Sequence, residues 1–351
     1  MGRQTTTFYL NERPKGDIVK GQTFKSKTEE APTADQLKDG QILVEALYLS
    51  LDPAMRGWLN DIRSYVPPVG IGEKMRGAAI SRVLASKSSK AKEGDLVNAM
   101  VGWTEVGIVD EKTFEVVELP ANCKVTDALG VLGLTGLTAY FGLAKIGNVQ
   151  KGDTVVVSGA AGATGSVVGQ IAKLKGARVV GLAGSDEKCD WLKSELGFDV
   201  ALNYKSPSFS KDFEKATPDF INVYWDNVGG EILELALSRA AFRSRFVMCG
   251  SISGYNSPGK ESKGIRNFFQ VTAQRIRMEG FIVFDFLSEY EPARKELGQW
   301  LSEGKIKRKE TVIPGGLKEV ESAWEELFQG RNMGKLLLEV KPHQGNVGSK
   351  L

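Results

Sequence analysis

A glycine-rich turn between an apolar strand and a helix is the feature that most constrains how this chain can fold. Residues 154–158 predict a buried strand, and residues 165–175 carry apolar side chains at helical spacing. The turn at 158–165 reads Ser-Gly-Ala-Ala-Gly-Ala-Thr-Gly. Glycine there permits a sharp bend, a close approach of backbone to phosphate, and close packing of helix on strand. Because the first amides of a helix have no partner within it, the turn predicts a bound dinucleotide pyrophosphate. A tight turn that serves packing alone is the alternative.

Strands and helices alternate on both sides of this turn. Alternation of this kind predicts a doubly wound parallel sheet, because parallel strands need crossover connections that helices provide. Further strands are expected at 178–182, 200–203, 220–225, 245–249 and 279–286, and helices at 126–132, 137–143, 187–196, 231–237 and 290–303.

The first third of the chain has a different pattern. Short strands are expected at 41–50, 76–84, 94–101 and 104–119, separated by turns that contain glycine or proline. This pattern is typical of an all-β, barrel-like domain. Residues 305–341 return to strand–helix–strand and are expected to rejoin that domain. The sequence therefore predicts an α/β chain in which 1–125 and 305–351 form one domain and 126–304 form a nucleotide-binding domain.

Composition narrows the classes of function. The formal net charge is +3, and no apolar run approaches the roughly 20 residues of a membrane helix, so no nucleic-acid or membrane partner is expected. Three widely spaced cysteines favour a reducing cytoplasm over a disulfide scaffold. The one histidine, His343, lies in a polar tail, and no CxxC or HxxxH spacing occurs. Neither catalytic zinc nor histidine-dependent nucleophilic catalysis is therefore expected.

The end of the strand at 178–182 bears on the choice between NAD and NADP. NAD sites usually place Asp or Glu there, whereas this strand runs into Gly184 and Ser185. Gly184 leaves space, Ser185 can donate a hydrogen bond, and Lys188 follows one helical turn later. A 2′-phosphate carries about two negative charges, so a lysine suits it and NADP is favoured. Asp186 and Glu187 are expected to complement the helix N-terminus, and Ser185 as a plain N-cap with Lys188 on the surface is the alternative.

A set of short segments also carries a resemblance to a known family. These are Leu51–Gly57 (LDPAMRG), Leu134–Tyr140 (LTGLTAY), Ala183–Lys188 (AGSDEK), Asn203–Lys205 (NYK), Trp225–Gly230 (WDNVGG), Cys249–Asn256 (CGSISGYN), Gly280–Phe286 (GFIVFDF) and Asn332–Lys335 (NMGK). With the glycine turn, they resemble the zinc-independent medium-chain dehydrogenase/reductases, in the group of prostaglandin reductases and NADP-dependent alkenal double-bond reductases. The resemblance runs in order over nearly the whole chain. It implies a GroES-like β-barrel catalytic domain, a Rossmann NADP-binding domain, and a homodimer formed through edge strands around 281–286.

The resemblance also implies a cofactor site assembled from several loops. Its members are Gly162, Ala163, Thr164 and Gly165 at the pyrophosphate; Gly184, Ser185, Lys188 and Tyr204 at the adenosine phosphate-ribose; Asn227, Cys249, Ser251 and Tyr255 at the ribose and nicotinamide; the backbone of Phe281, Ile282 and Val283 at the carboxamide; and Asn332 from the returning chain. Most also have a plainer interpretation, as turn residues, a small buried cysteine, half-buried aromatics, core or dimer interface.

The activity implied by the resemblance is reduction of the C=C bond of an α,β-unsaturated aldehyde or ketone, with hydride delivered from NADPH to the β-carbon. Negative charge then develops on the carbonyl oxygen, and the candidate donors to it are a tyrosine hydroxyl, for which Tyr255 is chosen, and the cofactor's own ribose hydroxyl. The alternative for Tyr255 is a loop side chain that only closes the pocket. Ala54 stands where many members carry tyrosine, which puts the substrate in doubt. Thr135 stands where many members carry proline. An NADPH quinone reductase and a catalytically silent NADPH-binding protein remain alternatives.

Overall fold

The computed structural model describes residues 2–257 and 264–342, which form two compact units. Unit 1 comprises the chain up to Leu129, Glu310–Asn332 and the chain from Leu336 onward. Unit 2 comprises Gly130–Lys309 and Met333–Lys335. The division into domains expected from the sequence, with limits at 125 and 305, stays a prediction.

Unit 1 is built on a sheet in the order β14-β15-β3-β4-β5-β7, with β6 paired to β3. The pairs β15-β3, β3-β4, β3-β6, β4-β5 and β5-β7 are antiparallel. A separate antiparallel hairpin, β1-β2, and helix α8 belong to the same unit. The elements are β1 (Gln4–Leu10), β2 (Phe24–Glu30), β3 (Gln41–Ser50), β4 (Ala79–Ser86), β5 (Leu96–Ala99), β6 (Val106–Asp110), β7 (Phe114–Val116), β14 (Glu310–Ile313), α8 (Val320–Phe328) and β15 (Lys335–Glu339).

The core of unit 1 is aromatic at its centre. The ring of Trp103 lies 4.8 Å from that of Phe24 and 5.5 Å from that of Trp324, and all three side chains are fully buried. Phe24 comes from the hairpin, Trp103 from the loop between β5 and β6, and Trp324 from α8. Large aromatic side chains bury much apolar area, so this cluster holds segments from both ends of the unit's sequence together.

Arg56 is a fully buried charged residue of unit 1. It lies in the 3-10 helix Pro53–Leu59, and its guanidinium donates to Asn60 Oδ1 (2.8 Å), Pro14 O (3.1 Å) and Gly16 O (2.9 Å). Burial lowers the pKa of Arg56 from its ordinary value. The arginine of the LDPAMRG segment thus ties an N-terminal loop to the 3-10 helix.

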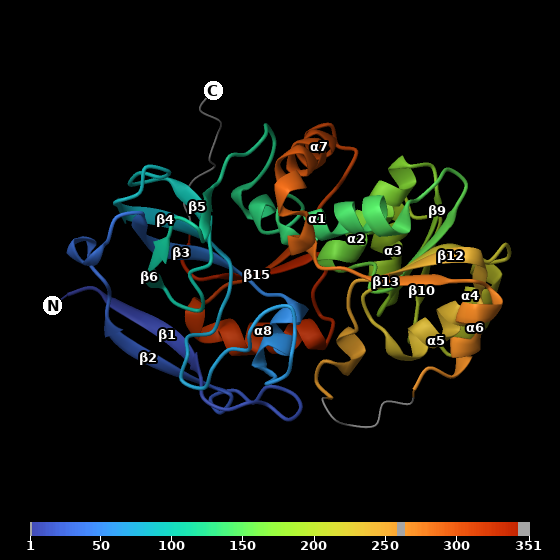
Figure 1. Cartoon of the computed structure of the whole chain (residues 1–351), viewed down its shortest axis with the longest axis horizontal. Helices are drawn as coiled ribbons and strands as arrows, with labels where there is room; N and C mark the ends of the chain where they lie inside the picture. Colours follow the sequence, from blue (N-terminus) through green and yellow to red (C-terminus); the bar gives the residue numbers. More distant parts are fainter. Residues whose placement is uncertain (1, 258–263, 343–351) are drawn as a thin grey trace. The chain divides into compact units, whose positions relative to one another are not determined.

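Unit 2 contains a sheet in the order β10-β9-β8-β11-β12-β13, and every neighbouring pair is parallel. Helices α1 and α2 lie on one face and α5 and α6 on the other (Figure 1). The elements are α1 (Leu134–Phe141), β8 (Thr154–Val157), α2 (Ala163–Leu174), β9 (Arg178–Ala183), α3 (Asp186–Ser194), β10 (Val200–Asn203), α4 (Phe209–Ala216), β11 (Ile221–Asp226), α5 (Gly230–Ser238), β12 (Ala240–Met248), α6 (Phe269–Ala273), β13 (Arg277–Gly280) and α7 (Tyr290–Ser302).

Two of the departures from the sequence expectation in unit 2 have a clear physical reason. The strand expected over 279–286 ends at Gly280, and Val283–Glu289 form a 3-10 helix instead. Asp285 causes this, because its carboxylate accepts the amide of Ile282 (3.2 Å) while its own amide donates to Ile282 O (2.9 Å). Helix α4 was not expected, and the hydroxyl of Ser208, which donates to Asp212 (2.6 Å), marks its start.

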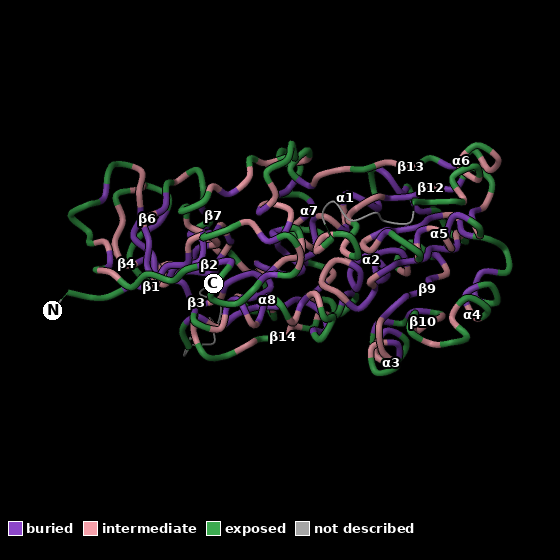
Figure 2. The backbone as a smooth tube through the Cα atoms, turned by 90° about the horizontal axis from the view of Figure 1, so that it is seen from below, coloured by how far each residue is buried: buried purple, intermediate pink, exposed green. Residues whose placement is uncertain are grey.

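Burial follows the sheets within each unit. In Figure 2 the purple, buried stretches run along the strands, whereas green, exposed residues gather in loops. Strand β8 is buried at all four residues, as expected for a central strand covered on both faces. Among the residues that the structure describes, no helix is both long and apolar enough to cross a membrane.

Candidate functional site

The carboxyl ends of β8 and β11 mark the point in unit 2 where the strand order reverses. Open α/β sheets bind their ligands in the crevice outside such a switch point. The glycine turn follows β8 here. Gly159 adopts a left-handed φ of 59°, and the amide of Ala160 donates to Leu182 O of β9 (2.9 Å). These two features fold the chain back over the strand ends before α2 begins.

The N-terminus of α2 has the geometry of an anion-binding site. Gly162 is the N-cap residue and offers no side chain to the helix. The amide of Ser166 is the first to bond back, to Gly162 O (3.0 Å). The amides of Ala163, Thr164 and Gly165 therefore precede the helix's own hydrogen-bond ladder and add to its partial positive charge. This arrangement fits a pyrophosphate group.

Two glycines make the turn sterically feasible. A Cβ on Gly165 would lie 2.4 Å from Gly159 O, so only glycine lets the helix pack this close to the turn. Gly334 has a left-handed φ of 70°, and its amide donates to Ala161 O (2.8 Å). The segment Met333–Lys335 thus supports the glycine turn from within unit 2.

Replacing Gly165 with alanine should lower the thermal midpoint and weaken NADPH binding about tenfold, because the clash is with backbone and forces a shift costing about 1–3 kcal/mol. Differential scanning fluorimetry with and without NADPH measures both effects. The matched control is Gly57→Ala, whose added Cβ meets nothing within 4 Å. Equal midpoints and equal NADPH responses in the two variants would contradict the assignment.

The end of β9 is shaped by Gly184 and Tyr204. The amide of Tyr204 donates to Ala183 O (3.0 Å), and a Cβ on Gly184 would lie 2.8 Å from Tyr204 Oη. Glycine at 184 therefore makes room for the tyrosine ring. Ser185 is the N-cap of α3, where its Oγ accepts the amide of Lys188 (3.3 Å). The N-cap role is thus observed, and the Ser185 hydroxyl keeps its proton for a further bond.

Positive charge gathers at the same strand end. Burial lowers the pKa of the Lys188 ammonium and repulsion from Lys205 lowers it further, whereas Glu187 acts in the opposite direction. Asp186 lies on the same helix, and its carboxylate accepts a hydrogen bond from Asn203 Nδ2 (2.9 Å). Lys205 was not among the expected site residues. Its place directly after Tyr204 was the available signal, and the field it shares with Lys188 suits a phosphate.

Asn227, at the end of β11, has both ends of its side chain engaged. Its Nδ2 donates to Ser158 O (2.7 Å), and its Oδ1 accepts Trp225 Nε1–H (3.0 Å). Its backbone amide donates to Ser158 Oγ (2.9 Å). Asn227 therefore joins the ends of the two strands at the switch point.

The loop after β12 lies directly against this joint. The amide of Cys249 donates to Asp226 O (2.9 Å), and the amide of Ser251 donates to Tyr255 Oη (3.3 Å). The bond from Ser251 uses a lone pair of the Tyr255 oxygen and not its proton. Burial, followed by the charge of Asp226, raises the pKa of the Cys249 thiol to about 12. The structure thus brings Asn227, Cys249, Ser251 and Tyr255 into one connected group of loops.

The raised pKa of Cys249 predicts a pH profile for its alkylation. Because only the thiolate reacts, the rate should rise about tenfold per pH unit through pH 10 without levelling off near an ordinary thiol pKa. Mass spectrometry of the iodoacetamide-labelled Cys249 peptide measures this rate, and Cys249→Ser confirms the peptide. A plateau below pH 9 would show that the thiol is not in the buried environment described.

The three backbone positions after β13 are not equivalent. Ile282 has its amide and carbonyl engaged by Asp285, as described for the 3-10 helix. Phe281 packs its ring at 5.9 Å against Trp225, and Val283 is buried. The side chains therefore serve packing, and a role toward a carboxamide rests on backbone groups.

Asn332 is assigned to the other unit. It is 8% exposed, belongs to unit 1, and directly precedes the Met333–Lys335 segment of unit 2. Its membership of one cofactor site with the residues above stays a prediction.

Two family models match the chain. One, described as the N-terminal domain of oxidoreductase, covers residues 6–117, and the other, described as zinc-binding dehydrogenase, covers 163–299. The putative NADP-dependent oxidoreductase YfmJ of Bacillus subtilis (strain 168) is 42% identical over 94% of this chain and 96% of its own. Prostaglandin reductase 1 of Mus musculus is 43% identical over 90% and 93%. The crystal structure of CurA in complex with NADPH from Vibrio vulnificus superposes with a TM-score of 0.89 at 36% identity, over 96% of this chain and 100% of that one.

This chain is a zinc-independent medium-chain dehydrogenase/reductase. It belongs to the group of prostaglandin reductases and NADP-dependent alkenal double-bond reductases. The expected fold, a GroES-like domain with a Rossmann domain, is confirmed, as are the expected enzyme class and cofactor, an NADP-dependent oxidoreductase.

The donor set of this medium-chain reductase fits the zinc-independent branch. Within the described ranges, no group of three or more His, Cys, Asp or Glu side chains could hold a metal ion. His343 lies outside the described residues.

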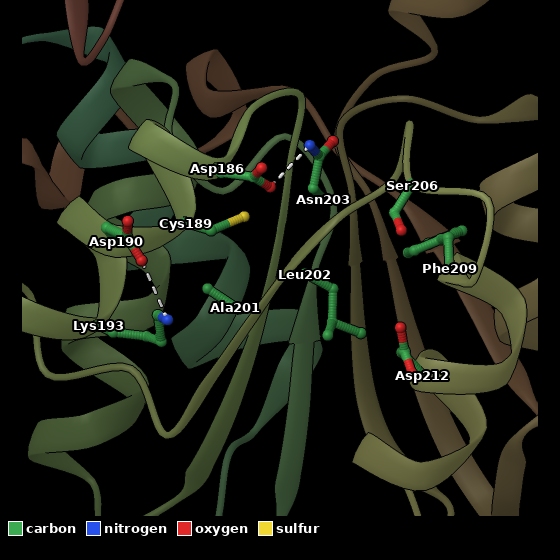
Figure 3. Close-up of a pocket in the computed structure, with 10 residues that line it drawn as sticks. All are labelled: Asp186, Cys189, Asp190, Lys193, Ala201, Leu202, Asn203, Ser206, Phe209 and Asp212. Carbon is green, nitrogen blue, oxygen red and sulfur yellow. Dashed lines mark hydrogen bonds and ion pairs between the residues drawn. The ribbon is translucent and has the colours of Figure 1, made fainter.

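A pocket of about 330 Å³ lies among α3, β10 and α4 in unit 2 of this reductase (Figure 3). The carboxylates of Asp186, Asp190 and Asp212 line it, and Lys193 is paired with Asp190 (3.1 Å). Negative charge on the walls opposes phosphate. None of the expected cofactor residues lines this pocket, so we do not assign the dinucleotide to it.

Proposed function

We propose that this chain reduces the C=C bond of α,β-unsaturated aldehydes or ketones, using NADPH. The observation that carries the proposal is the 43% identity to prostaglandin reductase 1 over 90% of the chain. The helix N-terminus at the switch point, which suits a dinucleotide phosphate, supports it further. Its partners are then a small enal or enone and NADPH.

The proposed cofactor site has three parts within unit 2. The first turn of α2, from Gly162 to Gly165, receives the pyrophosphate. Gly184, Ser185, Lys188 and Tyr204 receive the adenosine phosphate-ribose, and we add Lys205 to them. The nicotinamide half belongs to Asn227, Cys249, Ser251 and Tyr255, with the backbone at Phe281, Ile282 and Val283. Asn332 is proposed as a further contact.

In the proposed reaction, bound NADPH supplies a hydride to the β-carbon of the substrate. The enzyme's own contribution is to hold the substrate in near-attack geometry and to meet the charge that develops on the carbonyl oxygen. Tyr255 is the proposed donor to that oxygen. The resulting enolate takes a proton at its α-carbon from water or a tyrosine, which completes the saturated product.

An NADPH-oxidation screen tests the function. Short 2-alkenals, cinnamaldehyde-type enals and cyclic enones should be reduced, with the saturated carbonyl product identified by mass spectrometry and NADH as the control cofactor. Turnover of quinones alone would replace the proposal with a quinone reductase. Thermal stabilisation by NADPH without turnover of any of these substrates would indicate a silent NADPH-binding protein.

Lys188 and Lys205 should set the preference for NADPH over NADH. Replacing both with alanine should raise the Kd for NADPH about tenfold and leave the Kd for NADH nearly unchanged, because NADH lacks the 2′-phosphate that they face. Nicotinamide fluorescence titration measures both constants. The control is Lys193→Ala. Lys193 lies on the same helix as Lys188, α3, but is paired with Asp190. An equal loss for NADPH and NADH would refute the assignment.

Assembly and location follow from the same proposal. We propose a homodimer in the cytoplasm, consistent with the three cysteine thiols and with β13 as the outermost strand of the unit 2 sheet. The expected contact at 281–286 is not a strand, so β13 itself (Arg277–Gly280) is the strand available for pairing. Light scattering in solution tests this, and a mass of 38.2 kDa would contradict it.

A further inference from the structure

Asp226, the last residue of β11, is a buried carboxylate at the switch point that the proposed mechanism does not use. Its exposed fraction is 0%. Its Oδ1 accepts hydrogen bonds from the Gly229 amide (2.9 Å), the Val228 amide (3.0 Å), the Ser158 hydroxyl (3.0 Å) and the Tyr224 hydroxyl (3.2 Å). Its Oδ2 is also buried, and no described residue donates a hydrogen bond to it.

The charge of this carboxylate has no cationic partner among the described residues. Burial raises the pKa of Asp226, and the amides of Gly229 and Val228 oppose that rise. A buried, unpaired carboxylate is costly, whereas the turn it makes with the next amides can be made by a neutral serine or asparagine side chain. The turn therefore does not explain why the side chain is an acid.

The position of Asp226 suggests what its charge acts on. Its backbone oxygen accepts the amides of Cys249 (2.9 Å) and Gly250 (3.0 Å), and the next residue, Asn227, bonds to Ser158. The carboxylate thus lies behind the loops proposed to receive the nicotinamide half of the cofactor. Its charge acts on one residue of those loops, because it contributes to the raised pKa of the Cys249 thiol.

We infer that Asp226, kept ionised by the four hydrogen bonds that its Oδ1 accepts, holds a fixed negative charge behind the nicotinamide loops and thereby stabilises the oxidised cofactor relative to the reduced one. The nicotinamide ring is neutral in NADPH and carries one positive charge after it has given up a hydride. A negative charge set in the protein favours the charged ring and so assists the departure of hydride. Asp226 then acts on the cofactor by its charge and not by direct contact. This inference rests on the proposed function.

Equilibrium binding of the two cofactor forms tests this without turnover. In Asp226→Asn and Asp226→Ser, the ratio of the Kd for NADP⁺ to the Kd for NADPH should rise about fivefold, the order expected for one unit charge in a partly buried site. Isothermal titration calorimetry gives both constants. The matched control is Tyr224→Phe, which removes one hydrogen bond but keeps the charge, and its ratio should match the wild type.

The outcomes separate the inference from the function it rests on. A ratio unchanged within about twofold in a folded neutral variant, with both constants weakened together, would reduce Asp226 to a turn residue. Failure of both neutral variants to fold would also overturn the inference, because the turn itself would then require the acid. Wild-type protein that binds neither cofactor form would instead refute the proposed function.

Discussion

Replacing Tyr255 with phenylalanine should lower kcat for a conjugated enone by about 10²- to 10³-fold, the usual effect of removing one donor to a developing oxyanion. The Kd for NADPH should change much less, because phenylalanine keeps the ring that is proposed to contact the nicotinamide half and loses only the hydroxyl that is proposed to meet the substrate oxygen. Stopped-flow measurement of single-turnover NADPH oxidation isolates the hydride step and avoids confusion with product release.

The control for Tyr255→Phe is Tyr140→Phe. The Tyr140 hydroxyl donates to Glu296 (2.6 Å) on α7, so its removal deletes a tyrosine hydroxyl without touching the proposed site. Because Tyr255 Oη also accepts the Ser251 amide, the thermal midpoint of Tyr255→Phe should be measured as well. An unchanged kcat would eliminate the enolate-donor role, whereas a parallel loss of kcat and NADPH affinity would indicate that the loop had moved.

Replacing Arg56 with methionine should lower the free energy of unfolding by about 3 kcal/mol, since three acceptors lose a charged donor at about 1 kcal/mol each. Those acceptors are Asn60 Oδ1, Pro14 O and Gly16 O, and the fully buried site gives water no access to replace the lost donor. For a chain of 351 residues, with an unfolding entropy of about 2.1 cal/mol/K per residue, the thermal midpoint should fall by about 4 °C. Urea unfolding followed by tryptophan fluorescence measures the change.

The control for Arg56→Met is Arg63→Met, an exposed arginine of the same unit. A surface change of this kind should alter stability by no more than about 0.5 kcal/mol. If Arg56→Met matched Arg63→Met in stability, the desolvation cost of the buried guanidinium would outweigh its hydrogen bonds. The arginine of the LDPAMRG segment would then need an explanation other than stability.

The fold of unit 2 could be predicted from the sequence because strands and helices alternate regularly along it. Strand β8, the glycine turn and α2 could be predicted because apolar periodicity changes from strand to helix across glycines that each have a steric reason. The strand expected over 279–286 was wrong, because hydrophobicity alone cannot distinguish a strand from a packed loop. The cap made by Asp285, which turns the chain at Ile282, is a single side-chain bond with no periodic signal.

Only part of the candidate site could be predicted from the sequence. Motif residues such as Ser185 and Asn227 could be named from the sequence, but their partners could not. Ser185 caps a helix, and Asn227 joins two strand ends, both through contacts that depend on the fold. Lys205 and Asp226 lie inside segments that were recognised in the sequence. Lys205 matters because it lies close enough to Lys188 to lower its pKa, and Asp226 matters because it is buried, and neither property can be seen in one sequence.

Gly334 carries a consequence for the order in which the molecule assembles. Its amide completes the glycine turn at Ala161, about 170 residues earlier in the chain, so the contact has a very high sequence separation. During synthesis, most of unit 2 has emerged from the ribosome well before this segment exists. The glycine turn therefore spends that interval without the hydrogen bond from Gly334, and we expect it to be less well ordered until Met333–Lys335 have docked. We therefore expect the cofactor to bind late in the assembly of the molecule, after the two ends of this contact have met.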